Sequence, residues 1–176
     1  MSEKSIAIVI PNLLLGGAEK YAMKLVKFFN SRNNVNADLV CLEDLVRYDF
    51  FDKENTFFLS SNSRLKSPFS KLFSLIFQIR AFNNLVNKKK YDSVIFFLNR
   101  SILFLTVYRF FFKHSFNVII SFRSFMSSQV LNNDSTISAY FLNKFIYKKI
   151  IRNSQNYATS LITNSRESKI DLIQKF

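Results

Sequence analysis

Both glycines of the chain are adjacent, at Gly16 and Gly17, and they separate two strongly patterned segments. Before them, residues 6–10 form a continuous apolar, β-branched run, which is typical of a strand covered on both faces of a parallel sheet. After them, apolar residues recur at helical spacing: Ala18, Tyr21, Ala22, Leu25, Val26 and Phe29. The sequence therefore predicts a strand, a glycine turn and a helix in succession.

A strand, turn and helix in this order can bind a ligand at the turn. The unit places backbone N–H groups and the positive end of a helix dipole at the carboxyl end of a buried strand. Gly16 and Gly17 would let a phosphate or a sugar approach the backbone closely. The alternative is that the two glycines only form a tight turn, because the segment is neither Gly-x-Gly-x-x-Gly nor a Walker loop.

Apolar strands and helices alternate along the rest of the chain. Strands are expected at residues 37–42, 56–59, 94–98, 116–122 and 158–163, and helices at 69–86, 102–112 and 136–152. A closing helix should follow Asn164 as its cap, with Glu167 in the capping-box position. This order favours right-handed crossovers and a Rossmann-like, doubly wound parallel sheet. A length of 176 residues suffices for one such α/β domain and is too short for two.

The formal net charge of +13 is compatible with nucleic acid, an anionic membrane surface or a phosphorylated substrate as partner. Nucleic acid is disfavoured because the basic residues are scattered and no known nucleic-acid-binding signature occurs. Arg100 and Arg109 interrupt the most apolar region, which argues against a membrane-spanning helix. Pro11 and Asn12 interrupt the apolar start, which argues against a signal peptide. The single cysteine, Cys41, is interpreted as a strand filler in a cytoplasmic protein.

Two segments carry a resemblance to a known family. The strand, Pro11, the short apolar loop and Gly-Gly-Ala-Glu-Lys at residues 16–20 resemble the opening of the amino-terminal domain of family-four glycosyltransferases of the GT-B fold. Residues 160–165, Ser-Leu-Ile-Thr-Asn-Ser, followed by a polar helix, are similar to a late strand of that domain. The resemblance covers residues 6–174 in the family's order. It implies that residues 1–176 are an N-terminal, acceptor-side domain whose Gly-Gly loop faces the donor's phosphates and sugar.

The resemblance also implies an activity and a missing partner. The family's C-terminal nucleotide-sugar-binding domain has no counterpart in these residues, so the chain alone is expected to be inactive. It would be a fragment, a subunit whose donor half is a separate chain, or a non-catalytic remnant. The implied enzyme is a retaining glycosyltransferase that moves a sugar from a nucleotide-sugar to a lipid-linked or growing surface polysaccharide acceptor. It needs no cofactor and no metal. A basic nucleic-acid-binding or membrane-surface module remains the alternative.

Candidate site residues follow from the expected sheet, because ligand groups in a doubly wound sheet lie at the carboxyl ends of the strands. Polar residues that follow apolar strands are Asn12 with Gly16 and Gly17, Asn99 and Arg100, Arg123 and Ser124, and Asn164 and Ser165. An arginine at position 123 resembles the family's pattern, and its fork could hold a pyrophosphate or a carboxylate. The alternative is a surface arginine that pairs with a helix end. No metal-ligand cluster occurs, and the single histidine, His114, is expected at a helix end.

A basic aromatic segment at residues 140–152 suggests a membrane contact. Aromatic residues alternate there with Lys144, Lys148, Lys149 and Arg152. Such a helix can lie in the headgroup region of an anionic bilayer, on the inner face of the cell membrane. The alternative is that its apolar face is core and its lysines are solvated.

Overall fold

The computed structural model describes residues 3–14, 16–48, 51–60, 68–122, 149 and 156–175. These residues form the strands β1 (Lys4–Ile10), β2 (Val35–Cys41), β3 (Thr56–Phe58), β4 (Ser93–Phe97), β5 (Asn117–Phe122) and β6 (Ser160–Thr163). They also form the helices α1 (Gly17–Asn30), α2 (Pro68–Lys89), α3 (Leu98–Phe111) and α6 (Arg166–Lys175). The expected helix at residues 136–152 lies outside the described residues, apart from Lys149.

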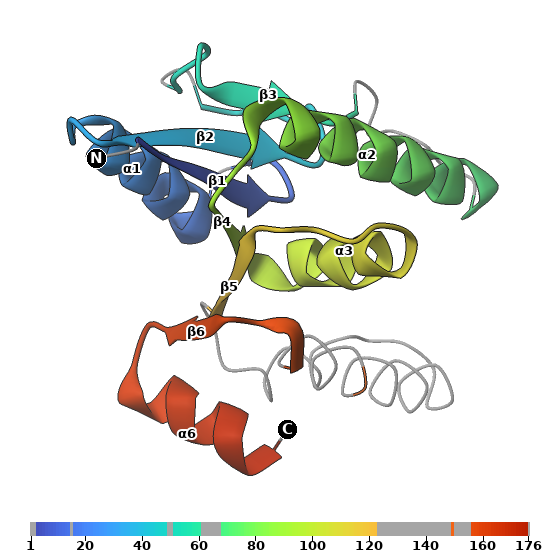
Figure 1. Ribbon diagram of the computed structural model, residues 1–176. Helices are drawn as coiled ribbons and strands as arrows, with labels where there is room; N and C mark the ends of the chain where they lie inside the picture. Colours follow the sequence, from blue (N-terminus) through green and yellow to red (C-terminus); the bar gives the residue numbers. More distant parts are fainter. Residues whose placement is uncertain are drawn as a thin grey trace.

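The strands form one six-stranded, all-parallel sheet in the order β3-β2-β1-β4-β5-β6 (Figure 1). From the central strand β1 the chain moves outward through α1 to β2 and then to β3. Helix α2 returns it to β4 on the other side of β1, where Ile6 is opposite Ser93. The chain then continues outward through α3 to β5. The predicted Rossmann-like, doubly wound parallel sheet is confirmed.

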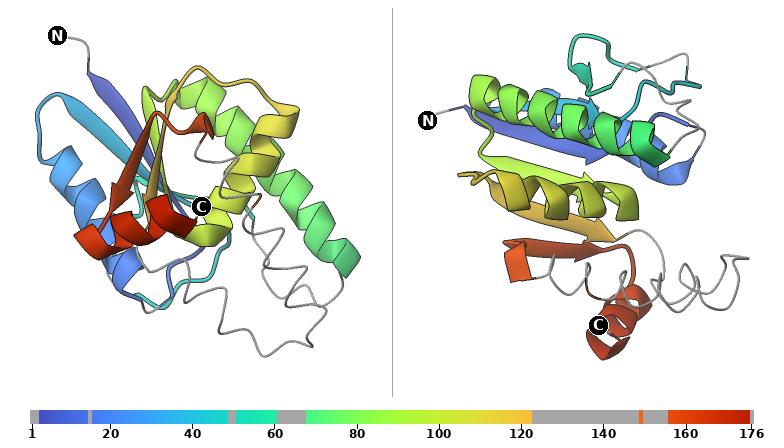
Figure 2. Two further views of the ribbon diagram at one scale, coloured as in Figure 1. Left: turned by 90° about the horizontal axis from the view of Figure 1, so that it is seen from below. Right: turned by 90° about the vertical axis from the view of Figure 1, so that its right-hand side faces the viewer.

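Helices cover both faces of the sheet, with α1 on one face and α2 and α3 on the other (Figure 2). Successive residues of a strand point to opposite faces, so β1 contributes Ala7 and Val9 to one core and Ile8 and Ile10 to the other. All four of these side chains are fully buried. Burial on both faces explains why the strands read as continuous apolar runs rather than as alternating ones.

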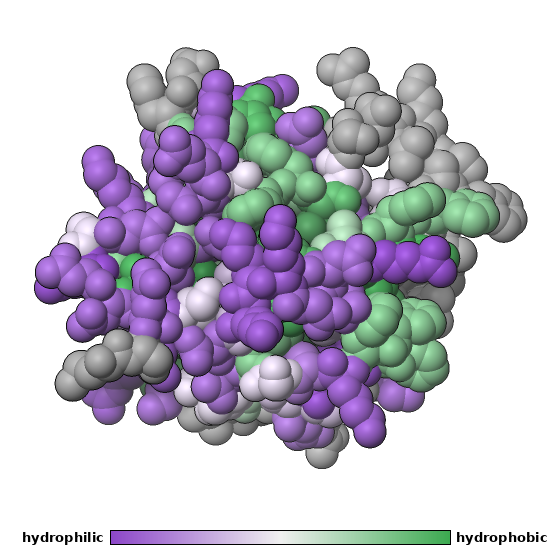
Figure 3. All heavy atoms as spheres, turned by 45° about the horizontal axis from the view of Figure 1, so that its top comes forward, coloured by the Kyte–Doolittle hydropathy of each residue, from purple (hydrophilic) through white to green (hydrophobic). Residues whose placement is uncertain are grey.

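Among the side chains of α2 that the structure describes, the buried apolar ones lie in the second half of the helix. Phe82 is fully buried, and its ring centroid lies 5.0 Å from that of Tyr108 and 5.4 Å from that of Phe104, both on α3. By contrast, Phe73 and Phe77 are exposed. Figure 3 shows apolar side chains exposed among hydrophilic ones on the side of the molecule that comes forward in that view. No helix among the described residues is long and apolar enough to cross a bilayer.

A buried ionic cluster fixes the end of α2 to the sheet. Asp38 on β2 is 2% exposed, and its carboxylate lies 3.1 Å from the Lys89 ammonium and accepts a 2.7 Å hydrogen bond from the Tyr91 hydroxyl. Burial, the hydrogen bond to Asp38 and the negative charge of Asp38 raise the pKa of Tyr91 well above its usual range. The tyrosine therefore remains a hydrogen-bond donor at neutral pH.

Candidate functional site

The sheet order reverses between β1 and β4, which are neighbours in space although four elements separate them in sequence. Helix α1 begins at Gly17 after β1, and α3 begins at Leu98 after β4. These two helices leave the same edge of the sheet toward opposite faces. In open α/β sheets, ligands bind at this topological switch point. We call residues 11–14, Gly16, the first turns of α1 and α3, and Glu43 the switch-point edge.

The chain that follows β2 holds the glycine loop in place. The Leu13 N–H donates to the Leu45 carbonyl, and the Arg47 N–H donates to the Leu13 carbonyl, both at 2.9 Å. The Tyr48 hydroxyl accepts from the Gly16 N–H and donates to the Gly16 carbonyl, each at 2.9 Å. Asn12 forms a hydrogen bond within the loop itself: its Oδ1 accepts from the Leu14 N–H at 3.3 Å. Nothing in the sequence pattern indicated Tyr48, because this contact is purely tertiary.

Neither glycine has a positive φ, so backbone conformation does not explain them. Gly16 is extended, with φ −142° and ψ 162°, which any residue can adopt. A Cβ at Gly16 would lie 2.1 Å from Oε2 of Glu19, whose side chain folds back over the start of the helix. At Gly17, a Cβ would have no described atom within 4 Å. Within the part of the chain that the structure describes, the backbone at Gly17 thus faces open space at the start of α1.

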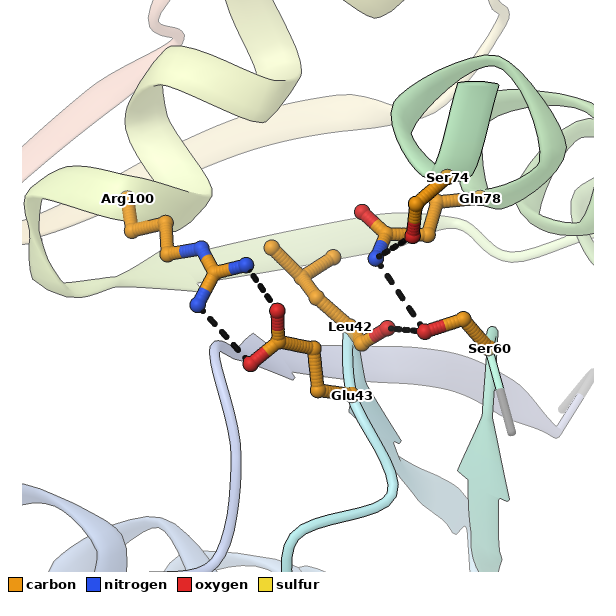
Figure 4. A network of polar contacts seen from close by, with 6 residues as sticks. All are labelled: Leu42, Glu43, Ser60, Ser74, Gln78 and Arg100. Carbon is orange, nitrogen blue, oxygen red and sulfur yellow. Dashed lines mark hydrogen bonds and ion pairs between the residues drawn. The ribbon is translucent and has the colours of Figure 1, made fainter. Parts of the chain in front are cut away.

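Arg100 and Glu43 form a bidentate ion pair across the end of β1 (Figure 4). Nη1 of Arg100 donates to Oε2 of Glu43 at 2.9 Å, and Nη2 donates to Oε1. The Arg100 side chain is 50% exposed, whereas that of Glu43 is 12% exposed. Glu43 is also fixed by its backbone, since its N–H donates to the Pro11 carbonyl at 3.0 Å. The pair connects the first turn of α3 to the segment after β2.

A second polar network closes the end of β3 (Figure 4). The Ser60 hydroxyl donates to the Leu42 carbonyl at 3.1 Å. The side-chain amide of Gln78, which is buried, donates to the hydroxyls of Ser60 at 3.2 Å and Ser74 at 3.3 Å. This network ties α2 to the same edge and explains the buried amide.

The junction between β4 and α3 is strained. Leu98 has a φ of 67°, in the left-handed region that a leucine rarely adopts. The Ser101 hydroxyl donates to the carbonyl of Leu98 at 2.9 Å and to that of Phe97. Helix α3 was expected from residue 102 but begins at Leu98, so Asn99 and Arg100 lie in its first turn rather than in a loop. Strained backbone of this kind is concentrated at functional sites.

Comparison with known proteins supports the fold. No family model matches the sequence, and no curated protein matches it. Among solved structures, the chain matches a sucrose-phosphate synthase from Thermosynechococcus elongatus with a TM-score of 0.70 and 16% identity, over 98% of this chain and 45% of that one. It matches a UDP-N-acetylglucosamine 2-epimerase from Rickettsia bellii with a TM-score of 0.60 and 13% identity, over 98% of this chain and 42% of that one.

A third match is a UGT transferase from Siraitia grosvenorii in complex with UDP, with a TM-score of 0.56 and 11% identity, over 98% of this chain and 48% of that one. The fold is that of a GT-B Rossmann-like domain. At these identities the likeness shows the fold alone. This GT-B-type domain spans less than half of each of these three proteins.

Asn164 lies on the same sheet edge of the GT-B-type domain but away from the switch point. It follows β6, which β4 and β5 separate from β1, a spacing of roughly 14 Å at the usual strand separation. The cap of α6 is Ser165, whose Oγ accepts from the Ser168 N–H at 3.1 Å. The expectation that Asn164 caps this helix is therefore wrong by one residue. Asn164 instead accepts from the Ser168 hydroxyl at 3.1 Å.

Several predicted residues lie outside the described part of the domain: Arg123, Ser124, Lys144, Lys148 and Arg152. Lys149 is described, and it is helical and exposed. Among the described residues, no three His, Cys, Asp or Glu side chains gather as a metal site would require. Cys41 is fully buried in β2, and burial, with a smaller effect of Asp44, raises the pKa of its thiol to about 12. The interpretation of Cys41 as a strand filler is confirmed.

Proposed function

We propose that this GT-B-type domain is the acceptor-side, N-terminal domain of a retaining family-four glycosyltransferase. The enzyme moves a sugar from a nucleotide-sugar to a lipid-linked or growing surface polysaccharide acceptor. The observation on which the proposal rests is Gly17, which neither backbone conformation nor packing explains and which begins a helix at the switch point. Space without a side chain at a helix N-terminus suits the close approach of a phosphate.

In this proposal the switch-point edge forms one wall of a cleft, and a second Rossmann-like domain or a separate chain forms the other. The N–H groups of the first turn of α1 would stabilise negative charge that develops on the leaving diphosphate. Asn12, Asn99 and Arg123 would orient the substrates, with Asn164 farther along the same edge. No cofactor or metal takes part, and the domain alone does not catalyse sugar transfer.

The acceptor also suggests where the enzyme works. A lipid-linked acceptor is reached from the cytoplasmic face of the membrane, so we place the domain there as a peripheral protein. Lys144, Lys148, Lys149 and Arg152 would contact anionic headgroups, and the chain's charge of +13 favours that contact.

Substitution of Gly17 tests the proposal by separating stability from binding. Gly17→Ala should raise the free energy of unfolding by about 0.4–1 kcal/mol, because it restricts the unfolded chain at a position with ordinary φ. The added methyl group should nevertheless weaken binding of a nucleoside diphosphate, and Gly17→Val should weaken it further. Binding is measured by amide chemical-shift titration with UDP, GDP, CDP and dTDP, and stability is measured by urea unfolding.

Asn84→Val, at an exposed position of α2, is the matched control for a β-branched substitution in a helix. It should leave nucleotide binding unchanged. Equal nucleotide affinity in the wild type and in Gly17→Val would contradict the proposed role of the glycine loop.

A further inference from the structure

We propose that Arg100 binds a phosphate group of the substrate at the switch-point edge, and that Glu43 is its positioning residue. The inference rests on the proposed function, because it assigns a second contact to the same site. Arg100 follows β4 and the glycine loop follows β1, and these two strands are adjacent in the sheet. A single phosphate or diphosphate placed at the switch point can therefore approach both the start of α1 and Arg100.

The guanidinium of Arg100 has donors to spare. Arginine has five N–H donors in a planar fork. The bidentate pair with Glu43 uses one donor on Nη1 and one on Nη2, while half of the side chain is open to solvent. A planar fork with exposed donors is the geometry that recognises phosphate oxygens. Lysine in the same place would lack this fork.

Glu43 fixes the plane of that fork. Its carboxylate is largely buried, and its backbone is bonded to the Pro11 carbonyl at the end of β1. The neighbouring Leu42 N–H donates to the Ile10 carbonyl at 3.0 Å. Two consecutive backbone N–H groups, those of Leu42 and Glu43, thus hold Glu43 against the end of the central strand. A guanidinium docked on it loses less rotamer freedom when a ligand binds.

The strained backbone of Leu98 lies two residues before Arg100. A helix that begins immediately at the end of β4 brings Arg100 back over the end of β1, where Glu43 is (Figure 4). The left-handed φ of Leu98 accompanies this abrupt change from strand to helix. Retention of an unfavourable φ at the junction is consistent with a functional requirement on the first turn of α3.

The experiment uses the whole chain with ¹⁵N-labelled arginine, so that the Nε–H signal of Arg100 reports directly on its guanidinium. The probes are inorganic pyrophosphate, UDP, farnesyl diphosphate and uridine. We expect saturable shifts of this signal with the phosphate-bearing probes and no shift with uridine. Arg100→Lys should weaken their binding about tenfold, because the planar fork is lost. Arg80→Lys, on the exposed surface of α2, should leave binding unchanged.

A second set of variants distinguishes binding from a purely structural ion pair. Arg100→Gln leaves the Glu43 carboxylate without its partner and should lower the midpoint of urea unfolding. The double variant Arg100→Gln/Glu43→Gln should recover stability but not phosphate binding. Glu43→Asp keeps the charge but shortens the side chain. It should shift the Arg100 Nε–H signal of the ligand-free protein and weaken binding by several-fold.

The outcomes separate the two proposals. If Gly17→Val abolishes phosphate binding while Arg100→Lys and Arg100→Gln bind like the wild type, the assignment of Arg100 is wrong and the proposed function survives. If none of the phosphate-bearing probes shifts any signal at the switch-point edge, both are wrong. Tighter binding of UDP would identify the phosphate as the donor's, and tighter binding of farnesyl diphosphate would identify it as the acceptor's. Either preference supports the role of Arg100 when Arg100→Lys weakens the binding of the preferred probe.

Discussion

At the scale of single residues, the left-handed backbone of Leu98 makes a specific prediction. A φ of 67° costs a residue with a Cβ about 1–2 kcal/mol, and glycine avoids that cost. Both Leu98→Ala and Leu98→Gly remove the half-buried side chain, so the difference between them isolates the backbone. We expect Leu98→Gly to be more stable than Leu98→Ala by about 1 kcal/mol in urea unfolding.

The same pair of substitutions at Asn84 provides the reference. This residue is exposed in the interior of α2, where glycine should be less stable than alanine by about 1 kcal/mol. An identical order of stability at both positions would show that Leu98 does not have a left-handed backbone in solution.

At this scale the sequence indicated position where the signal was local. Asn12, the glycine pair and Asn99 with Arg100 each follow an apolar strand, and the structure places all of them at the switch-point edge. The contacts that fix this edge were not predictable, because Tyr48 and Glu43 belong to a mixed, charged segment with no periodicity. Neither glycine has a positive φ, so a left-handed turn conformation does not account for them.

At the scale of elements, the start of α6 offers a clean test of capping. The Ser165 hydroxyl accepts from the Ser168 N–H, so Ser165→Ala should destabilise the helix by about 0.5–2 kcal/mol. Asn164→Ala should have a smaller effect, because Asn164 precedes the cap residue Ser165 and accepts from the Ser168 hydroxyl. Amide hydrogen exchange in α6 measures both effects, and greater loss of protection in Asn164→Ala would contradict the assignment.

Most strands and helices were predictable, because the spacing of their apolar residues and the length of the apolar segment indicate the same kind of element. The errors occurred at helix starts, where neighbouring residues compete. Asn164 and Ser165 are both good caps, and only the position of the first helical turn decides between them. Helix α3 was expected too late because its first turn contains Asn99 and Arg100, which appear as loop residues in a sequence whose apolar run starts again at Ile102.

At the scale of the whole molecule, the stability of the domain should depend on the protonation of His114. Burial, and to a lesser extent the charge of Arg109, hold the pKa of His114 below its ordinary value, although its hydrogen bond to the Phe116 carbonyl acts in the opposite direction. Nδ1 lies 3.1 Å from that carbonyl, while Nε2 is buried without a hydrogen-bond partner among the described residues. The unfolded chain therefore binds the proton more readily than the folded domain.

A lowered folded-state pKa means that stability is complete above the unfolded value of about 6.5 and is lost as the pH falls below it. We expect the wild type to lose stability relative to His114→Gln between about pH 7.5 and 5.5. Urea unfolding at several pH values measures this difference, and the imidazole proton signals report the pKa directly. A difference that is constant over this range would contradict the predicted shift.

The overall topology was predictable because alternating strands and helices leave few arrangements of a parallel sheet. The sequence could not show where the order of strands reverses, since β1 and β4 pair only after the intervening chain has returned through α2. The position of the switch point, and hence of the site, depends on this long-range pairing.

The pairing of β1 with β4 also determines when the domain can first complete its sheet during synthesis. A nascent chain that has left the ribosome only as far as β3 can assemble one flank of the sheet, with Ile6 beside Ala37. It still lacks Ser93 and everything that follows on the opposite flank. Closing so long a loop is entropically costly and slow. During translation, the exposed edge of β1 should therefore be a point at which chaperones bind or chains aggregate.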